Sequence, residues 1–164
     1  IPHLDSALYY ASINLHEVGG NNLAFSNKYF EKKIIEQGWR KTYSWCAYAI
    51  KTFMTMAKAK EPTGNGLAIS FIKKNSVSAK DVKYGKVKIG PGWLAIWKHG
   101  DTYKGHIGIV YLWNIFTGYI VEGNTGPSNS GSQSDASFGG EFLRYREIQP
   151  RNHFRIVAFT QVKY

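Results

Sequence analysis

Apolar and polar positions follow a helical period in the first half of the chain. The clearest pattern covers residues 46–57, where apolar side chains recur three or four residues apart and form one stripe: Cys46, Ala49, Ile50, Phe53, Met54 and Ala57. Ser44 stands just before this stripe and is predicted to cap the helix at its N-terminus. The turn residues of 62–66 are predicted to end it.

Weaker helical patterns occur on both sides of this segment. Helices are expected over three further stretches: 5–16, 26–37 and 67–74. The second of these has Ser26 or Asn27 as a candidate cap and Gly38 as a stop signal.

The second half of the chain changes to patterns typical of β-strands. Strands are expected over five segments: 93–97, 106–113, 119–123, 141–147 and 154–163. Residues 114–118 are predicted to form a hairpin turn. Residues 124–140 are rich in Gly, Ser and Asn and too long for a simple turn, which indicates a functional or mobile loop. Helices followed by antiparallel strands predict an α+β fold in one domain, 1–164, with the N-terminal helices packed on the sheet.

Composition narrows the class of protein. The single cysteine excludes an internal disulfide framework and a multi-cysteine zinc ribbon. No apolar run approaches 18 residues, so no membrane span is expected. The chain starts at Ile1 rather than Met, which we interpret as a mature or excised form.

The chain is strongly basic, with 21 Lys and Arg against 11 Asp and Glu and a formal net charge of +10. Such a charge favours anionic partners: nucleic acid, anionic lipid, or a bacterial envelope rich in teichoic acid or lipopolysaccharide. The lysines are dispersed, and an RNA-binding consensus, zinc-finger spacing and a basic leucine zipper are all absent. The charge therefore favours anionic partners but does not indicate which reaction the protein catalyses or which ligand it binds.

Cys46 lies at the predicted start of a helix. Unpaired backbone N–H groups and the helix dipole favour a thiolate there, and the thiolate is the nucleophilic form of cysteine. The alternative is a small buried apolar residue that begins the stripe.

The predicted hairpin brings candidate partners for this thiol together. Strand alternation and a turn about Ile115 and Phe116 set Asn124 opposite His106 or Gly108, and they bring Glu122 within diagonal reach of the histidine. A histidine oriented by a carboxylate or amide is what a general base requires. Taken singly, these residues could equally be a structural histidine and polar residues at a strand end.

Four segments in this order resemble the CHAP family, the cysteine, histidine-dependent amidohydrolase/peptidase domains of the papain-like NlpC/P60 superfamily. They are 17–22 (EVGGNN), 44–49 (SWCAYA), 104–110 (KGHIGIV) and 121–125 (VEGNT). The resemblance extends over about residues 8–148 and implies a papain-like α+β fold. It also implies cleavage of an amide bond in the peptide part of peptidoglycan.

The resemblance assigns roles by position. Cys46 would be the nucleophile, His106 the general base and Glu122 the residue that orients it. Asn124 would be a fourth polar member that supports the histidine or the substrate. The backbone N–H of Cys46 is a candidate oxyanion donor.

The chain departs from the family pattern before the histidine strand, where Trp93 stands in place of the usual Asp after Pro-Gly. No acidic cluster lies near Cys46 in the sequence, so no metal or other cofactor is expected. Tyr43 and Trp45 flank the nucleophile and are predicted to line the substrate groove, since aromatic rings stack on sugars.

The sequence therefore predicts a secreted, periplasmic or envelope-associated monomer that hydrolyses peptidoglycan, with no nucleic acid as partner. If the protein is an antibacterial effector, a cognate immunity protein is the expected partner. Two alternatives stay open: a non-catalytic module that binds cell wall or nucleic acid, and an amide hydrolase or acyltransferase with another substrate. The bond that is cleaved is also open.

Overall fold

The computed structural model of the chain describes residues 1–126, 139–148 and 154–164. It has an α+β architecture built on a six-stranded antiparallel sheet with the strand order β3-β8-β4-β5-β6-β7. The six strands are β3 (Val77–Ser78), β4 (Leu94–His99), β5 (Gly105–Trp113), β6 (Thr117–Thr125), β7 (Gly140–Glu147) and β8 (Phe154–Thr160). The α+β class predicted from the sequence is confirmed.

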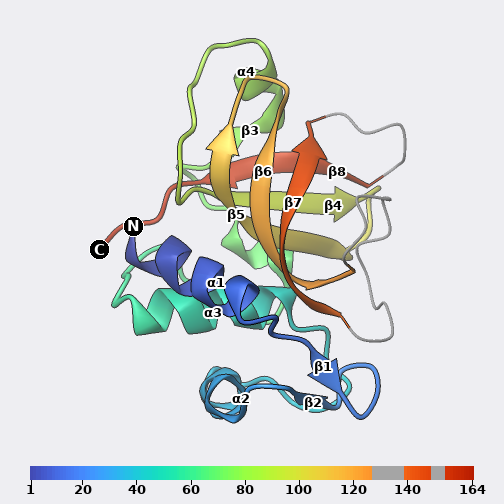
Figure 1. The fold of residues 1–164 in the computed structure, drawn as a ribbon. Coiled ribbons are helices and arrows are strands. Elements are labelled where there is room, and N and C mark those ends of the chain that lie inside the picture. The colour runs from blue at the N-terminus through green and yellow to red at the C-terminus, as the bar shows by residue number, and fades with distance from the viewer. Residues whose placement is uncertain (127–138, 149–153) are drawn as a thin grey trace.

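Helices cover one face of this sheet. They are α1 (Pro2–Ser12) and α3 (Cys46–Met56), which lie side by side, with α2 (Lys28–Glu36) beyond them (Figure 1). The short strands β1 (Glu17–Val18) and β2 (Ala24–Phe25) pair with each other next to α2. A 3₁₀ turn, η1 (Ala68–Phe71), and a short helix, α4 (Ala79–Lys83), complete the described elements.

Two apolar clusters fill the two faces of the sheet. On one face, Ile107, Ile109 and Val121 pack with the buried residues of α1 and α3. On the other face, Trp97 and Val110 belong to a second cluster that also includes Val82 of α4. Burial on both faces explains why the central strands read as nearly continuous apolar runs rather than alternating ones.

The helix boundaries test the sequence patterns. Asn27 caps α2, since its Oδ1 accepts a hydrogen bond from the Phe30 N–H at 2.8 Å, and Gly38 after the helix has a φ of +97° that an L side chain disfavours. The first helix begins at Pro2 rather than at residue 5, because proline is preorganised for the first helical turn. It ends at Ser12, short of the predicted residue 16.

Other predictions need correction. The helix expected over 67–74 is only the single turn of η1, and β3 and α4 were not predicted. The last strand ends at Thr160 rather than at residue 163, and β6 runs from Thr117 to Thr125, longer at both ends than expected. Most of the predicted 124–140 loop lies outside the described residues.

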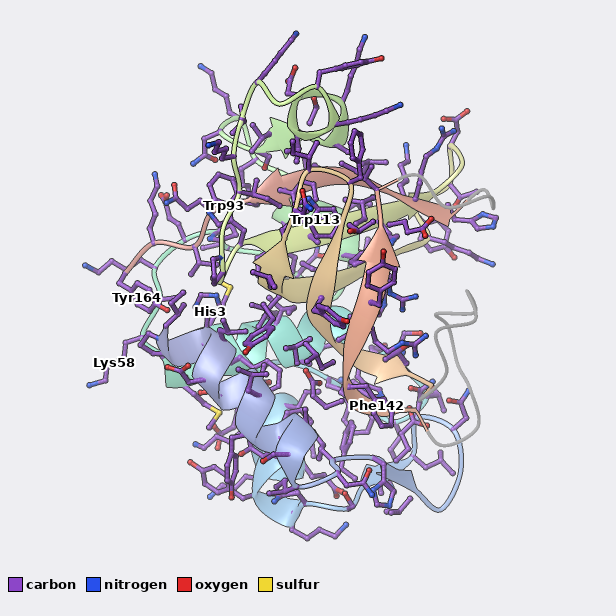
Figure 2. All side chains as sticks on the ribbon, turned by 45° about the horizontal axis from the view of Figure 1, so that its top comes forward. His3, Lys58, Trp93, Trp113, Phe142 and Tyr164 are labelled. Carbon is purple, nitrogen blue, oxygen red and sulfur yellow. The ribbon has the colours of Figure 1, made fainter. Side chains whose placement is uncertain are left out.

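The two ends of the chain meet beside the sheet (Figure 1). A ring nitrogen of His3 lies 2.5 Å from the Tyr164 hydroxyl, and the other lies 2.8 Å from the Gly92 carbonyl oxygen (Figure 2). These contacts tie α1 to the segment that leads into β4. In the described part of the chain, no helix is long and apolar enough to cross a membrane.

Candidate active site

Cys46 is the first residue of α3, and its side chain is 7% exposed. The helix begins one residue later than a Ser44 cap requires: Trp45 is the cap residue and no side chain caps the helix, so the predicted role of Ser44 is wrong. Trp45 fixes this end of the helix in another way. Its indole is buried edge-on against Phe25, and its Nε1 donates a hydrogen bond to Glu17 Oε1 at 2.6 Å.

The chain just before Cys46 is locally strained. Thr42 has a φ of +76°, which is unusual for a β-branched residue, and its N–H donates to the Asn22 carbonyl oxygen at 2.8 Å. Asn22 in turn donates its backbone N–H to Glu17 Oε2 at 3.0 Å. Glu17 thus holds both Trp45 and the Asn22 segment that anchors the approach to the nucleophile.

His106 is the second residue of β5 and is 2% exposed. It pairs across to Trp97 of β4, and the two rings lie 5.3 Å apart. Its Nε2 lies 2.8 Å from Glu122 Oε2, so the predicted diagonal contact across the hairpin is confirmed. Because Nε2 faces Glu122, the interaction of the ring with the Cys46 thiol falls to Nδ1.

Glu122 is fully buried and has a second, stronger partner that the sequence did not predict. Arg146 of β7 donates from Nε to Oε1 at 2.6 Å and from Nη2 to Oε2 at 2.7 Å. This is the bidentate geometry that suits a guanidinium and a carboxylate. The guanidinium also lies over the Trp97 ring, 6.0 Å from its centroid.

The contacts set the charge of these groups. Burial alone would raise the pKa of Glu122, but hydrogen bonds from Arg146 and His106 lower it below its ordinary value. Burial alone would lower the pKa of His106, but the hydrogen bonds to Cys46 and Glu122 raise it to about 9. Glu122 is therefore a carboxylate and His106 an imidazolium at neutral pH.

Asn124 lies at the end of β6, where the pairing with β7 becomes irregular between Glu122 and Thr125. It has a φ of +58°, a conformation that Asn tolerates better than most residues, and it is 2% exposed. Among the described residues its Oδ1 has no hydrogen-bond partner. A Cβ on Gly139 would lie 3.1 Å from both Asn124 Oδ1 and Glu17 Oε1, so the amide lies beside Glu17.

The two aromatic residues predicted to line a groove differ in exposure. Tyr43 is 48% exposed and stacks on Tyr48 with ring centroids 6.4 Å apart. Trp45 is 0% exposed and presents no surface on which a sugar could stack. Its prediction as a groove wall is corrected: the indole supports the start of α3 from within the core.

The site contains a second buried carboxyl group, Glu141 of β7, which the sequence did not predict. It is 1% exposed, and its Oε2 has no hydrogen-bond partner among the described residues. A Cβ on Gly123 would come within 2.6 Å of both this oxygen and the Trp45 ring, which places the carboxyl group next to the indole. Burial, followed by the charge of Glu122, raises the pKa of Glu141 well above its ordinary value, so the folded protein favours the protonated acid more strongly than water does.

A signal for Arg146 does exist in the sequence. Arg144 and Arg146 alternate with Tyr145 along a predicted strand, so both arginines share a face, and a cation on a covered face requires an anionic partner. Glu141 has no comparable signal, because nothing in its sequence neighbourhood distinguishes it from a solvated strand-end acid.

Comparisons with models of protein families, with curated proteins and with solved structures find no match to the chain. The described residues contain no group of three or more His, Cys, Asp and Glu side chains that could hold a metal ion. The site is therefore interpreted from its geometry. A thiol at a helix start, beside a charged histidine that a carboxylate orients, suits nucleophilic acyl transfer.

Proposed function

We propose that this protein is a papain-like cysteine hydrolase that cleaves an amide bond in the peptide part of peptidoglycan. The observation that carries the proposal is the buried series of side chains Cys46, His106 and Glu122. The choice of peptidoglycan rests on the resemblance of four ordered segments to the CHAP family. An envelope or extracellular location follows from this substrate.

The proposed reaction starts from a Cys46 thiolate beside a His106 imidazolium. The thiolate attacks the carbonyl carbon of the amide, and the backbone N–H of Cys46 at the start of α3 is a candidate donor to the oxyanion. His106 gives its Nδ1 proton to the leaving amine, and the C–N bond breaks to leave an acyl group on the sulfur. Neutral His106 then takes a proton from water, which attacks the thioester and releases the acid and the thiolate.

Glu122 supports both halves of this reaction. Its carboxylate accepts a hydrogen bond from Nε2, which holds the ring with Nδ1 toward the sulfur. Its negative charge also stabilises the imidazolium that precedes each proton transfer to the leaving amine. Asn124 lies at the same strand end and is the candidate for contact with substrate, since its buried Oδ1 has no partner among the described residues.

The test is mass spectrometry of the soluble fragments that purified sacculi release. Wild-type protein is compared with Cys46→Ala, and Cys46→Ser serves as the variant closest in size. We expect new fragments from the wild type, with masses that identify the cleaved bond, and a rate several powers of ten lower in both variants. Equal melting temperatures would show that the loss is chemical.

Three results would contradict the proposal in different ways. Fragments from Cys46→Ala at the wild-type rate would remove the thiol from the reaction. Cleavage of a defined peptide without cleavage of sacculi would favour another amide substrate. Sedimentation with sacculi, without fragments and with an unreactive thiol, would favour the non-catalytic binding module, for which the net charge of +10 is the supporting observation.

A further inference from the structure

Arg146 occupies a special place behind the candidate active site. It lies on β7 and is 6% exposed, and among the described residues its two hydrogen bonds go to the two oxygens of Glu122. It touches neither Cys46 nor the ring of His106 by a hydrogen bond. The hydrogen-bonded route from Arg146 toward the thiol therefore runs through Glu122 and His106.

We infer that Arg146 is a positioning residue, which holds Glu122 ionised and fixed against His106 so that Cys46 reacts as a thiolate. The inference rests on the proposed roles of Cys46 and His106. It adds to the proposed site a residue from β7, a strand that carries none of the predicted site residues.

The geometry supports this role over a purely structural one. A bidentate pair fixes the plane of the carboxylate as well as its position, and Oε2 is shared between Arg146 Nη2 at 2.7 Å and His106 Nε2 at 2.8 Å. Trp97 packs against both cationic groups, with its ring 5.3 Å from the His106 ring and 6.0 Å from the Arg146 guanidinium. The indole thus limits movement of both partners of Glu122.

Loss of the guanidinium has a defined electrostatic consequence. A buried carboxylate that loses its strongest partner is more costly to ionise. The site is therefore expected to take up a proton at a higher pH than in the wild type. Because Glu122 orients His106 and His106 is hydrogen-bonded to Cys46, we expect loss of the guanidinium to slow the reaction of the thiol near neutral pH. The other charged or titratable groups near Glu122 are Arg144 and Glu141 on β7 and Cys46 on α3.

The test measures the rate of Cys46 alkylation by iodoacetamide against pH, since the thiolate is the reacting form. In Arg146→Met we expect the pH of half-maximal alkylation to rise by about one unit, with a rate about tenfold lower at pH 6.5. Arg144→Gln is the matched control. Arg144 is also a buried arginine of β7, but its Nη1 donates a hydrogen bond to Thr125 Oγ1 at 3.1 Å and, among the described residues, it has no hydrogen bond to Glu122.

A double-variant comparison separates positioning from folding. If Arg146 acts through Glu122, Arg146→Met shifts the alkylation profile in the wild-type background but not in the Glu122→Gln background. An unchanged profile in folded Arg146→Met, or an equal shift in Arg144→Gln, would overturn the inference. If Arg146→Met does not fold, Arg146→Lys replaces it in both backgrounds, because lysine keeps the charge and loses the bidentate geometry.

This readout is independent of the cell wall. Reactive Cys46 that depends on Arg146, with no fragments from sacculi, would keep the positioning role and remove the proposed substrate. Sacculi cleaved equally well by the wild type and Arg146→Met, with the same pH profile, would remove the positioning role and keep the proposed function.

Discussion

Two carboxyl groups lie buried on neighbouring strands of the site, and their pKa values are shifted in opposite directions. Glu122 on β6 is 0% exposed and Glu141 on β7 is 1% exposed. Glu122 has its pKa lowered by Arg146 and His106 against the effect of burial, whereas burial and the charge of Glu122 raise the pKa of Glu141. Burial alone therefore does not decide whether an acid in this protein is ionised; its hydrogen-bond partners do.

The alternation of side chains along β7 explains the difference. Glu122 pairs directly with Phe142, so it shares a face with the even-numbered positions of β7, including Arg146. Glu141 points to the other face, where it lies next to Trp45, and no cationic side chain of the described residues is hydrogen-bonded to it. Phe142, the β7 residue that pairs with Glu122, is the direct neighbour of Glu141. Among the described residues, Glu122 has two cationic hydrogen-bond partners, whereas Glu141 has none.

The largest effect is expected when the charge of Glu122 is removed, because the difference between the two acids depends on it. In Glu122→Gln, a neutral amide replaces the carboxylate, so the His106 imidazolium loses its counter-charge and Arg146 is left buried without one. We expect the rate of fragment release from sacculi to fall by about two to four powers of ten. The free energy of unfolding should fall by about 3 kcal/mol or more, measured by chemical denaturation.

The same variant tests the charge state of the histidine. Without the carboxylate, the pKa of His106 should fall from about 9 toward its ordinary value of 6.5, which an NMR titration of the ring would follow. A His106 titration unchanged from that of the wild type would contradict the role of Glu122 in holding the imidazolium.

The residues nearest the nucleophile could be predicted because their positions depend on elements formed by residues that are close in the sequence. The period of the apolar stripe placed Cys46 at a helix start, and the pairing within one hairpin brought Glu122 to His106. A short turn limits the possible registers of two strands, but a bulge between Val110 and Leu112 shifts the pairing by one residue. This shift, which the sequence did not predict, places Glu122 on the same face as His106.

Arg146 could not be assigned to Glu122 in this way. The segment between β6 and β7 is long, so the sequence does not fix which residues of the two strands pair. The same reasoning explains the error at Trp45. Its position beside Cys46 suggested a groove, but its burial depends on contacts with Phe25 and Glu17, which come from a part of the chain about 20 to 28 residues away.

A smaller change removes one of the hydrogen bonds that support the buried acid Glu17. In Trp45→Phe, the ring stays apolar and aromatic, but Glu17 Oε1 loses its 2.6 Å hydrogen bond from the indole. Loss of a hydrogen bond to a buried carboxyl group, together with the smaller ring, should lower the free energy of unfolding by about 2–3 kcal/mol. Tyr43→Phe, a change at an exposed ring, is the control, with an expected change within about 0.5 kcal/mol. Equal stabilities of the two variants would show that the Trp45–Glu17 contact contributes little.

The smallest effect, and the sharpest contrast, is expected from Glu141→Gln. The change is chemically the same as Glu122→Gln, but glutamine resembles the protonated form of the acid, which the raised pKa of Glu141 shows that this position favours. Because the pKa of Glu141 is higher in the folded than in the unfolded state, the folded protein keeps a proton that the unfolded chain releases above the ordinary value of 4.5. The free energy of unfolding of the wild type therefore falls as the pH rises above that value, and the variant escapes this loss.

Thermal unfolding between pH 5 and pH 8 measures the difference. We expect similar melting temperatures at pH 5 and a variant more stable at pH 8 by about 2–4 °C for each kcal/mol that the wild type loses. Glu147→Gln is the matched control, since Glu147 is an exposed acid at the end of the same strand. A stability difference between Glu141→Gln and the wild type that does not change with pH would mean that Glu141 is ionised in the folded protein. The opposite responses of two buried acids to one substitution would then no longer hold.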